Sequence, residues 1–236
     1  MILLPWVNQL IRKHILLILL VMFFLGSAYP TGKLGVNASV PPILFGALRM
    51  GIVFICLIPF CKFIIPNQKY ILPLFAFSLS MGVGVNLFLY LGINASSIMS
   101  PLVIAAQLSI PIAIILSSIF IGESINYKKW ILIITSLFGI IFIGFDPKIA
   151  DEILGFLLVC AMAFFYASSQ VFSRYLKELD VKFTNASMGF IAFIILLIAS
   201  IFFEGNTVSN LKNLNIEAWL MVLHAGILCS LVGHMS

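Results

Sequence analysis

Long apolar runs separated by short polar breaks are the dominant pattern along the 236-residue chain. A helix rises 1.5 Å per residue, so runs of about 20 residues match the roughly 30 Å hydrocarbon core of a bilayer. The breaks hold Pro, Gly, Asn or charged residues, which punctuate apolar helices. The pattern predicts eight transmembrane helices, over residues 15–33, 40–60, 71–93, 98–121, 129–145, 153–173, 184–203 and 217–236.

The run at 98–121 differs from a plain membrane anchor because polar groups lie near its middle. It contains Gln107 and Pro111 but no charge. Proline has no amide hydrogen, so we expect the carbonyl of Gln107 to lose its helical partner and the helix to kink. Such groups are tolerated only where protein or a water-filled cavity satisfies them. Two interpretations stay open: a neighbouring helix or Ser109 satisfies them, or they line a path for a polar solute.

Basic side chains are distributed unequally between the loops on the two sides of the predicted bundle. With a cytoplasmic N-terminus, nine Lys or Arg residues fall in cytoplasmic loops and two in outside loops, which follows the positive-inside rule. One missed or extra span would scramble this alternation. The nine are Arg12, Lys13, Lys62, Lys69, Lys128, Lys129, Arg174, Lys177 and Lys182; the outside residues are Lys148 and Lys212, with the acids Asp146, Asp151, Glu152, Glu204 and Glu217.

Composition narrows the function classes. The chain is 62% apolar and 9% charged, far from the roughly 25% charged of soluble domains, so it is an integral membrane protein. Its net charge of +5 is spread over short loops, and nucleic-acid binding needs basic residues clustered on one face. The four cysteines lack C-x-x-C spacing, so we expect no disulfide framework, metal or cofactor.

Arg49 lies in the middle of the second predicted span. Insertion of an arginine at this depth costs about 2.5–3.5 kcal/mol, so it has either a functional role or a structural one as a clamp on polar neighbours. Lys33 lies at the outer end of the first span, where it can snorkel to the surface. Every Asp and Glu falls in a loop or at a span end, which leaves His224 and His234 as the titratable groups of the last span.

An internal repeat is visible at a shift of 141 residues. The shift aligns 23–27 with 164–168, both an aromatic pair followed by a small residue and a serine, and Lys33 with Arg174. It moves the chain by five spans, an odd number, so the second copy would cross the membrane in the opposite sense. Gly82 in the third span is loosely echoed by Gly226 in the eighth. The pattern is typical of inverted-topology repeats, which transporters use to expose one site to either side.

A set of small, proline and charged residues recurs at particular places in the predicted spans: Gly26, Ser27 and Lys33; Pro41, Pro42 and Arg49; 94–97, Pro101 and Pro111; Gly122 and Glu123; and Gly139. In these residues the chain resembles EamA-type transporters of the drug/metabolite transporter superfamily. The resemblance implies an all-α polytopic membrane bundle in a bacterial inner membrane, with ten helices in two inverted five-helix repeats. Residues 1–146 would be the first repeat and 151–236 a partial second repeat of three helices, so we expect a truncated carrier with one cavity wall open to lipid.

The resemblance further implies a central cavity lined by the first, third, fourth, sixth and eighth helices, with Arg49 as a fixed positive charge. Each polar candidate is equally compatible with a helix–helix hydrogen bond, worth about 0.6 kcal/mol on average. Glu123 opposes the dipole of the fourth helix and should have a cationic partner, Lys128, Lys129 or Arg174. Pro101, Pro111, Glu123, Lys33 and Arg174 are the structural or gating candidates. The substrate-path candidates are Arg49, Gln107, Asn86, Tyr90, Ser27, Tyr29, Ser168, Ser169, Gln170 and His224.

These features predict a secondary transporter, an exporter or exchanger of small polar metabolites or amino acids that works by alternating access. Its partners would be the lipid bilayer and a small-molecule substrate, and a homodimer stays open. One alternative is an inactive fragment that inserts but moves nothing. Another is a polytopic enzyme of lipid metabolism, which needs paired carboxylates, a His cluster or an activated nucleophile. The acids here are scattered, so we expect no enzymatic activity. The resemblance leaves substrate identity open.

Overall fold

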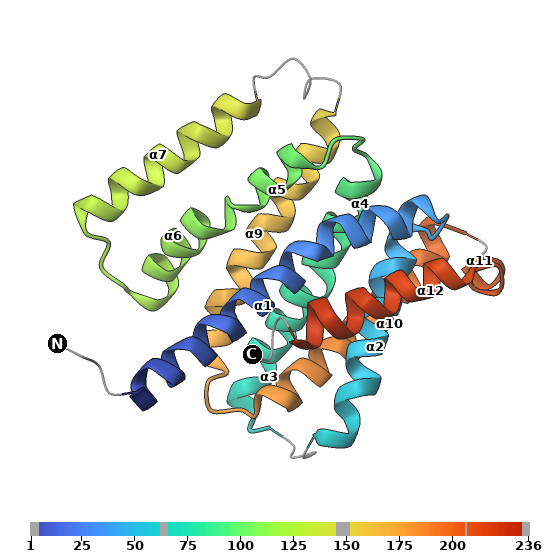
Figure 1. The fold of residues 1–236 in the computed structure, drawn as a ribbon, viewed down its shortest axis with the longest axis horizontal. Helices are drawn as coiled ribbons and strands as arrows, with labels where there is room; N and C mark the ends of the chain where they lie inside the picture. The colour runs from blue at the N-terminus through green and yellow to red at the C-terminus, as the bar shows by residue number, and fades with distance from the viewer. Residues whose placement is uncertain (1–4, 62–65, 145–151, 206, 233–236) are drawn as a thin grey trace.

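The computed structural model describes residues 5–61, 66–144, 152–205 and 207–232, and this part of the chain is entirely helical between its turns (Figure 1). η1 is a 3₁₀-helix, and η2 and η3 are π-helices. The order is α1 (Pro5–Asn37), α2 (Pro42–Leu57), η1 (Ile58–Phe60), α3 (Gln68–Phe77), η2 (Ser78–Gly84), α4 (Val85–Asn94), α5 (Ser100–Ala106), α6 (Ser109–Ile121), α7 (Tyr127–Gly144), α9 (Ile153–Tyr175), α10 (Val181–Phe203), α11 (Thr207–Lys212), α12 (Ile216–Leu223) and η3 (His224–Val232).

The predicted polytopic helical bundle is confirmed. Within the described residues, six segments are long and apolar enough to cross a membrane by length and composition, and each coincides with a predicted span. The predicted fifth span is the helix α7, and the predicted eighth is the shorter apolar helix Ile216–Leu231. The six segments are Ile18–Asn37, Pro42–Phe60, Gln68–Asn94, Ser100–Ile121, Ile153–Tyr175 and Val181–Phe203. Lys62, Asp146, Lys148, Asp151 and His234 lie outside the described residues.

α2 and α10 lie side by side and form a closely packed helix pair (Figure 1). Glycine lets the two backbones approach: a Cβ at Gly51 would lie 2.9 Å from the Phe193 ring, and one at Gly189 would lie 3.1 Å from the Met50 carbonyl oxygen. Close approach through small residues replaces the hydrophobic driving force that helices lack in lipid. α9 packs on α4 and α6 beside this pair, whereas α7 lies at the edge and contacts α5 and α6.

The fourth predicted span is broken into α5 and α6, so the predicted kink is present. Its expected cause is only partly right, because the carbonyl of Gln107 is not left without a partner. It accepts a hydrogen bond of 3.1 Å from the amide of Ile110. The backbone tightens from an α-turn to a 3₁₀-type turn before Pro111 and so satisfies the carbonyl locally. The carbonyl therefore loses its α-helical partner, as predicted, but the amide of Ile110 in the same turn satisfies it.

Polar contacts between distant segments gather at one end of the bundle around Glu152 and Glu204, here called the Glu152 face. The Glu152 carboxylate accepts hydrogen bonds from the hydroxyls of Ser96 and Ser97 and from the Ser97 and Ile98 amides. Glu204, at the end of α10, accepts from the first amides of α2, at 2.6 and 2.9 Å. A carboxylate at a helix N-terminus satisfies unpaired amides and complements the helix dipole.

The opposite end is held by contacts around Arg174, here called the Arg174 face. Glu123 forms an ion pair with Arg174 across the ends of α6 and α9. Lys69 lies 3.4 Å from the carboxylate of Glu178. Each contact joins segments that the alternating path of the chain brings to one face, so the contacts agree with the predicted alternation of the helices.

Candidate functional site

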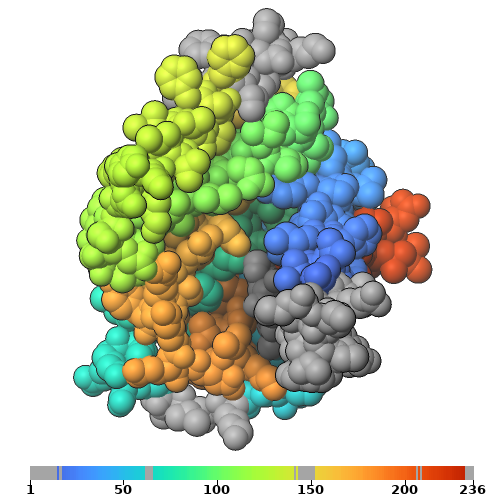
Figure 2. Space-filling model, turned by 60° about the vertical axis from the view of Figure 1, so that its left-hand side comes forward, coloured from blue at the N-terminus to red at the C-terminus, as the bar shows by residue number. Residues whose placement is uncertain are grey.

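A cavity of about 550 Å³ lies between α1, α2, α4, α5, α6, α9, α10 and the two π-helical segments. This volume falls within the usual range for small-molecule sites. Figure 2 shows a hollow beside the orange helices α9 and α10, bordered by blue α1, in which teal residues of the third predicted span are visible. Most of the wall is apolar and includes five methionines, Met22, Met50, Met81, Met162 and Met188.

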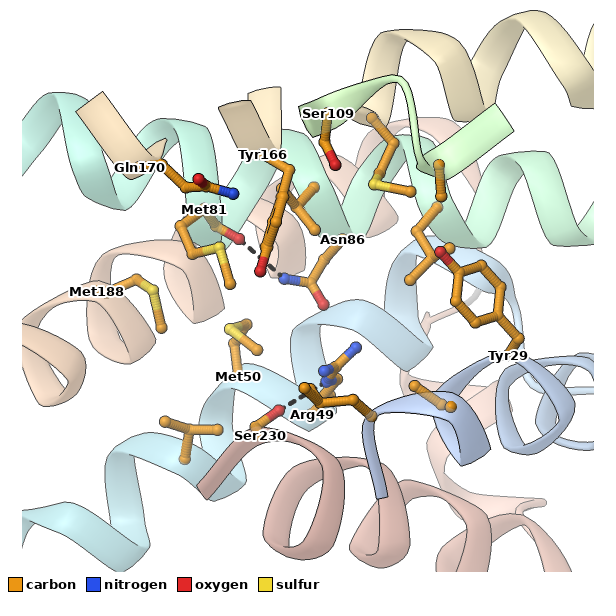
Figure 3. A pocket seen from close by; sticks show the side chains of 18 of the residues that line it. Tyr29, Arg49, Met50, Met81, Asn86, Ser109, Tyr166, Gln170, Met188 and Ser230 are labelled. Carbon is orange, nitrogen blue, oxygen red and sulfur yellow. Dashed lines mark hydrogen bonds between the residues drawn. The ribbon is translucent and has the colours of Figure 1, made fainter. Parts of the chain in front are cut away.

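Arg49 is the charged side chain on this wall within the described part of the chain. It is 6% exposed. Its Nε donates to the Ser230 hydroxyl at 2.8 Å and its Nη1 donates to the Tyr90 hydroxyl at 2.9 Å. Ser230 belongs to η3 and Tyr90 to α4, so the guanidinium of Arg49 in α2 is held by two other segments. Figure 3 shows its contact with Ser230. No carboxylate of the described residues forms an ion pair with it.

Asn86 supplies a second polar group on the same wall. Its side chain is 3% exposed, and its Nδ2 donates to the carbonyl of Gly82 at 2.7 Å. Its Oδ1 has no hydrogen-bond partner among the described residues. In Figure 3 Asn86 and Arg49 approach the same space from opposite sides. A buried acceptor without a partner costs about 1–3 kcal/mol, so this oxygen favours a donor in the cavity.

Five of the ten predicted substrate-path residues lie on the cavity wall. They are Arg49, Gln107, Asn86, Tyr29 and Gln170. Tyr90 lies behind the wall, fully buried, and contributes by accepting the hydrogen bond from Arg49. This arrangement gives Arg49 both predicted features: it is clamped by polar neighbours and it faces a cavity.

The other four predicted residues lie away from the cavity wall. The hydroxyls of Ser27, Ser168 and Ser169 donate to carbonyls one turn earlier in their own helices, at 2.8, 2.8 and 2.7 Å. His224 hydrogen-bonds through Nδ1 to the Thr31 hydroxyl at 3.2 Å, which joins η3 to α1. These contacts match the interpretation of polar residues as hydrogen-bonding groups between or within helices.

Four polar wall residues were missed by the sequence analysis as path residues: Ser109, Tyr166, Asn185 and Ser230. Tyr166 was within the repeated 164–168 motif, and Ser109 was considered only as a partner for Gln107. A lone serine or asparagine in an apolar helix carries little signal because it can bond to its own backbone. For Ser230 the missing information is the position of Arg49, which only the fold supplies.

The gating candidates lie at the ends of the bundle or at helix breaks. Glu123 has Arg174 as its partner, one of the three cations predicted. α6 ends at Ile121 and is capped by Gly122, whose φ of +76° lies in the left-handed region that suits glycine. Lys33 donates to the carbonyls of Ile93 and Ser96 near the end of α4, where a cation complements the helix dipole. Pro101 lies in the first turn of α5.

The described residues contain no group of three or more His, Cys, Asp or Glu side chains that could hold a metal ion. The site is therefore described by the guanidinium, the amide and the apolar wall. A family model described as the EamA-like transporter family matches residues 12–145, which run from α1 to the end of α7. No curated protein and no solved structure matches the chain.

Proposed function

The chain belongs to the EamA-like transporter family, and on that premise we propose that it is a secondary transporter that moves a small polar metabolite or amino acid through the cavity beside Arg49. The observation that carries the proposal is a space of about 550 Å³ inside a helical membrane bundle, with a buried cation on its wall. An intramembrane charge that faces a cavity is typical of a solute pathway.

We also propose that residues 1–146 and 151–236 are inverted repeats. The π-helices support this. Each lies in the third segment of its repeat and presents a glycine to the second helix of the other repeat, which is α10 for η2 and α2 for η3. A Cβ at Gly82 would lie 3.2 Å from the carbonyl oxygen of Met188 in α10. A Cβ at Gly226 would lie 3.3 Å from the carbonyl oxygen of Arg49 in α2. The two glycines lie in corresponding spans of the two proposed repeats, the third and the eighth.

Two pairs of residues at nearly equal separations in the chain also lie on the cavity wall. Tyr29 and Gln170 both lie on it, and they are related by the 141-residue shift of the sequence repeat. Asn86 and Ser230 both lie on it and are separated by the same number of residues as Gly82 and Gly226. A solute site on the axis that relates two inverted repeats can face either side when the repeats exchange conformations.

The two faces supply the groups that would close the path in turn. We place the Arg174 face in the cytoplasm of a bacterial cell, because that assignment puts most of the basic residues inside. Contacts such as Glu123 with Arg174 there, and Glu152 with Ser97 at the other face, join different helices through a few polar groups. Such contacts cost little to break, as alternating access requires.

Reconstituted vesicles test the transport proposal. Protein purified in detergent and placed in liposomes should exchange a radiolabelled mixture of organic acids and amino acids against an unlabelled internal pool. Arg49→Gln should abolish the exchange while the amount of inserted protein stays unchanged. Lys177→Gln removes an exposed cation and is the matched control that should retain it. Absence of exchange by the unmodified protein with every solute of the mixture would contradict the proposal.

A further inference from the structure

We propose that the solute held in this cavity is a small monocarboxylate that carries an uncharged hydrogen-bond donor, such as a hydroxyl, next to the carboxylate, and an apolar body. This inference rests on the proposed function, because it names the solute of the same site. It is drawn from three features of the wall: the charge of Arg49, the unpartnered oxygen of Asn86, and the methionines around them.

The negative group of the solute follows from the charge balance of the wall. Arg49 is buried and has no acidic partner among the described residues, and the described acids Glu152 and Glu204 are engaged with amides and hydroxyls at one face. A guanidinium has five N–H donors, of which Ser230 and Tyr90 use two. Nη2 makes no hydrogen bond to a described residue. An anion that binds at Nη2 would neutralise the charge of Arg49. A carboxylate fits there, because its two oxygens match the planar N–H donors of a guanidinium.

The donor follows from Asn86. Its Oδ1 can only accept a hydrogen bond, and its Nδ2 is already directed to the backbone of η2. A carboxylate alone would leave this oxygen unsatisfied, so the solute has to present an N–H or O–H beside the carboxylate. The two groups face one another across the cavity (Figure 3), so one small molecule can contact both.

The donor is uncharged because the wall has nothing to balance a second positive charge. No Asp or Glu of the described residues lines the cavity. An ammonium group on the solute would therefore lie near the guanidinium without a carboxylate of the protein beside it, and like charges at low dielectric repel. The anion of a hydroxy acid and the guanidinium of Arg49 together carry a net charge of zero. A zwitterionic amino acid brings no net charge and leaves the charge of Arg49 uncompensated.

The apolar part of the wall accepts a branched or aromatic body of variable shape. Methionine side chains come from five different segments, among them Met50 from α2 and Met188 from α10. Unbranched thioethers adapt to irregular shapes and contact aromatic rings favourably. The polar end of the solute would thus be specified by two residues, and the apolar end only by volume.

A binding panel with one apolar body tests the inference without transport. The probes are α-hydroxyisocaproate, isocaproate, leucine and isocaproamide, titrated calorimetrically into the full chain in lipid nanodiscs. We expect α-hydroxyisocaproate to bind best. Isocaproate lacks the donor for Asn86 and should bind roughly tenfold more weakly. Leucine should also bind more weakly, and isocaproamide should not bind. Equal or tighter binding of leucine or isocaproamide would overturn the inference.

Two variants of Asn86 separate recognition from folding. Asn86→Leu should erase the preference for α-hydroxyisocaproate over isocaproate. Asn86→Asp places an acid on the wall near Arg49, so it should weaken both acids and reverse the preference toward leucine. A variant that binds leucine is folded, which keeps the test valid if Asn86→Leu fails to fold. An unchanged order of affinities in Asn86→Asp would overturn the role given to this residue.

The inference and the transporter proposal fail in different ways. Binding of α-hydroxyisocaproate in nanodiscs without any exchange in vesicles would leave the solute class standing and contradict transport. Exchange of a solute from outside the panel, with no binding of α-hydroxyisocaproate, would leave transport standing and overturn the solute class. Retention of α-hydroxyisocaproate binding by Arg49→Gln would overturn the assignment of the carboxylate to Arg49.

Discussion

Arg49 keeps its charge inside the bundle because two hydroxyls from other helices hold it. Ser230 and Tyr90 accept from different nitrogens of the guanidinium, and the Ser230 hydroxyl in turn donates to the Ala225 carbonyl at 3.0 Å. Such a network fixes the orientation of the guanidinium, including Nη2, which makes no hydrogen bond to a described residue. The orientation determines which donor the guanidinium offers to a solute in the cavity.

Tyr90→Phe removes one of these acceptors without changing the shape of the core. Tyr90 is fully buried and its ring packs 4.7 Å from that of Phe45. We expect the free energy of unfolding to fall by about 1 kcal/mol, because a buried donor loses its partner. Exchange should slow as well, since Arg49 is less well oriented. Thermal unfolding in detergent and vesicle exchange measure the two effects.

The matched control for this change is Tyr127→Phe. Tyr127 is 66% exposed at the start of α7, so loss of its hydroxyl should alter neither quantity. If Tyr90→Phe behaves like this control, the hydroxyl does not orient Arg49.

Residue by residue, the sequence identified the polar groups but not their directions. Arg49, Asn86 and Tyr29 stand out in apolar runs because burial of such groups is costly. Ser27 and Ser169 stand out equally, yet their hydroxyls bond to their own helices. The rotation of each helix about its axis decides between these outcomes, and that rotation depends on contacts between segments far apart in the chain.

At the scale of elements, length and apolar composition predicted the helices well because a membrane span is a local property. The π-helices η2 and η3 were not predicted, since the extra residue per turn is stabilised by neighbours such as α10 and α2. The break between α5 and α6 was predicted from Pro111. The satisfaction of the Gln107 carbonyl was not, because it depends on how the turn tightens.

Pro111→Ala tests the function of that break. An amide at position 111 restores the donor for the Gln107 carbonyl, so α5 and α6 should join into one straighter helix. Gln107 and Ser109 would then rotate relative to the cavity that they line. We expect exchange to slow several-fold, and the distance between spin labels at Ser100 and Ile121 to lengthen.

Pro101→Ala serves as the control for Pro111→Ala. Pro101 lies in the first turn of α5, where a helix has no use for the amide hydrogen. Its replacement should leave the distance between the two spin labels unchanged, because no helical hydrogen bond is gained at position 101. Unchanged exchange in Pro111→Ala would mean that the kink has no role in transport.

Glu152 ties the segment after α4 to the start of α9, and its contact should depend on pH in a defined window. Hydrogen bonds from the Ser96 and Ser97 hydroxyls lower the pKa of Glu152 from 4.5 to about 2. A depressed pKa stabilises the fold at pH values above the unfolded pKa, and this contribution disappears as the pH falls toward the folded pKa. The contact should therefore persist at pH 5 and weaken between about 4.5 and 2.

Glu152→Gln should lower the free energy of unfolding by about 1 kcal/mol at neutral pH, because the amide binds the same donors less strongly at this partly exposed site. The difference in the free energy of unfolding between Glu152→Gln and the unmodified protein should stay constant from pH 7 to 5 and shrink below pH 5. Unfolding in detergent at several pH values measures it. Glu217→Gln, a change of an exposed acid in α12, is the control. A difference that does not depend on pH would contradict the role of the Glu152 charge.

At the scale of the whole molecule, the sequence contains the repeat only faintly. The 23–27 and 164–168 motifs align, but apolar segments align easily by chance. The fold adds an independent sign in the reciprocal contacts of Gly82 with α10 and Gly226 with α2. Such contacts join residues more than 100 positions apart in the chain, so no local pattern predicts them.

Alternating access makes a prediction that concerns both faces of the molecule together. Glu123→Cys with Arg174→Cys allows a short bifunctional thiol reagent to link α6 to α9 at the Arg174 face, and Ser97→Cys with Glu152→Cys allows the same at the other face. The background should carry alanine in place of the four native cysteines. Either link should stop exchange in vesicles, because the solute has to leave by each face in turn.

Binding measurements distinguish alternating access from cross-links that simply keep the solute out of the cavity. With the Glu152 face linked, a solute offered from the Arg174 side should still reach Arg49 and bind, and with the Arg174 face linked it should bind only from the opposite side. The single-cysteine variants treated with the same reagent should exchange normally and so exclude an effect of the modification itself. Exchange that continues with the Arg174 face linked would show that the path does not pass between α6 and α9, and exchange with the other face linked would show that it does not pass between the 96–98 segment and α9. Either result would contradict a mechanism in which the two repeats open alternately around one site.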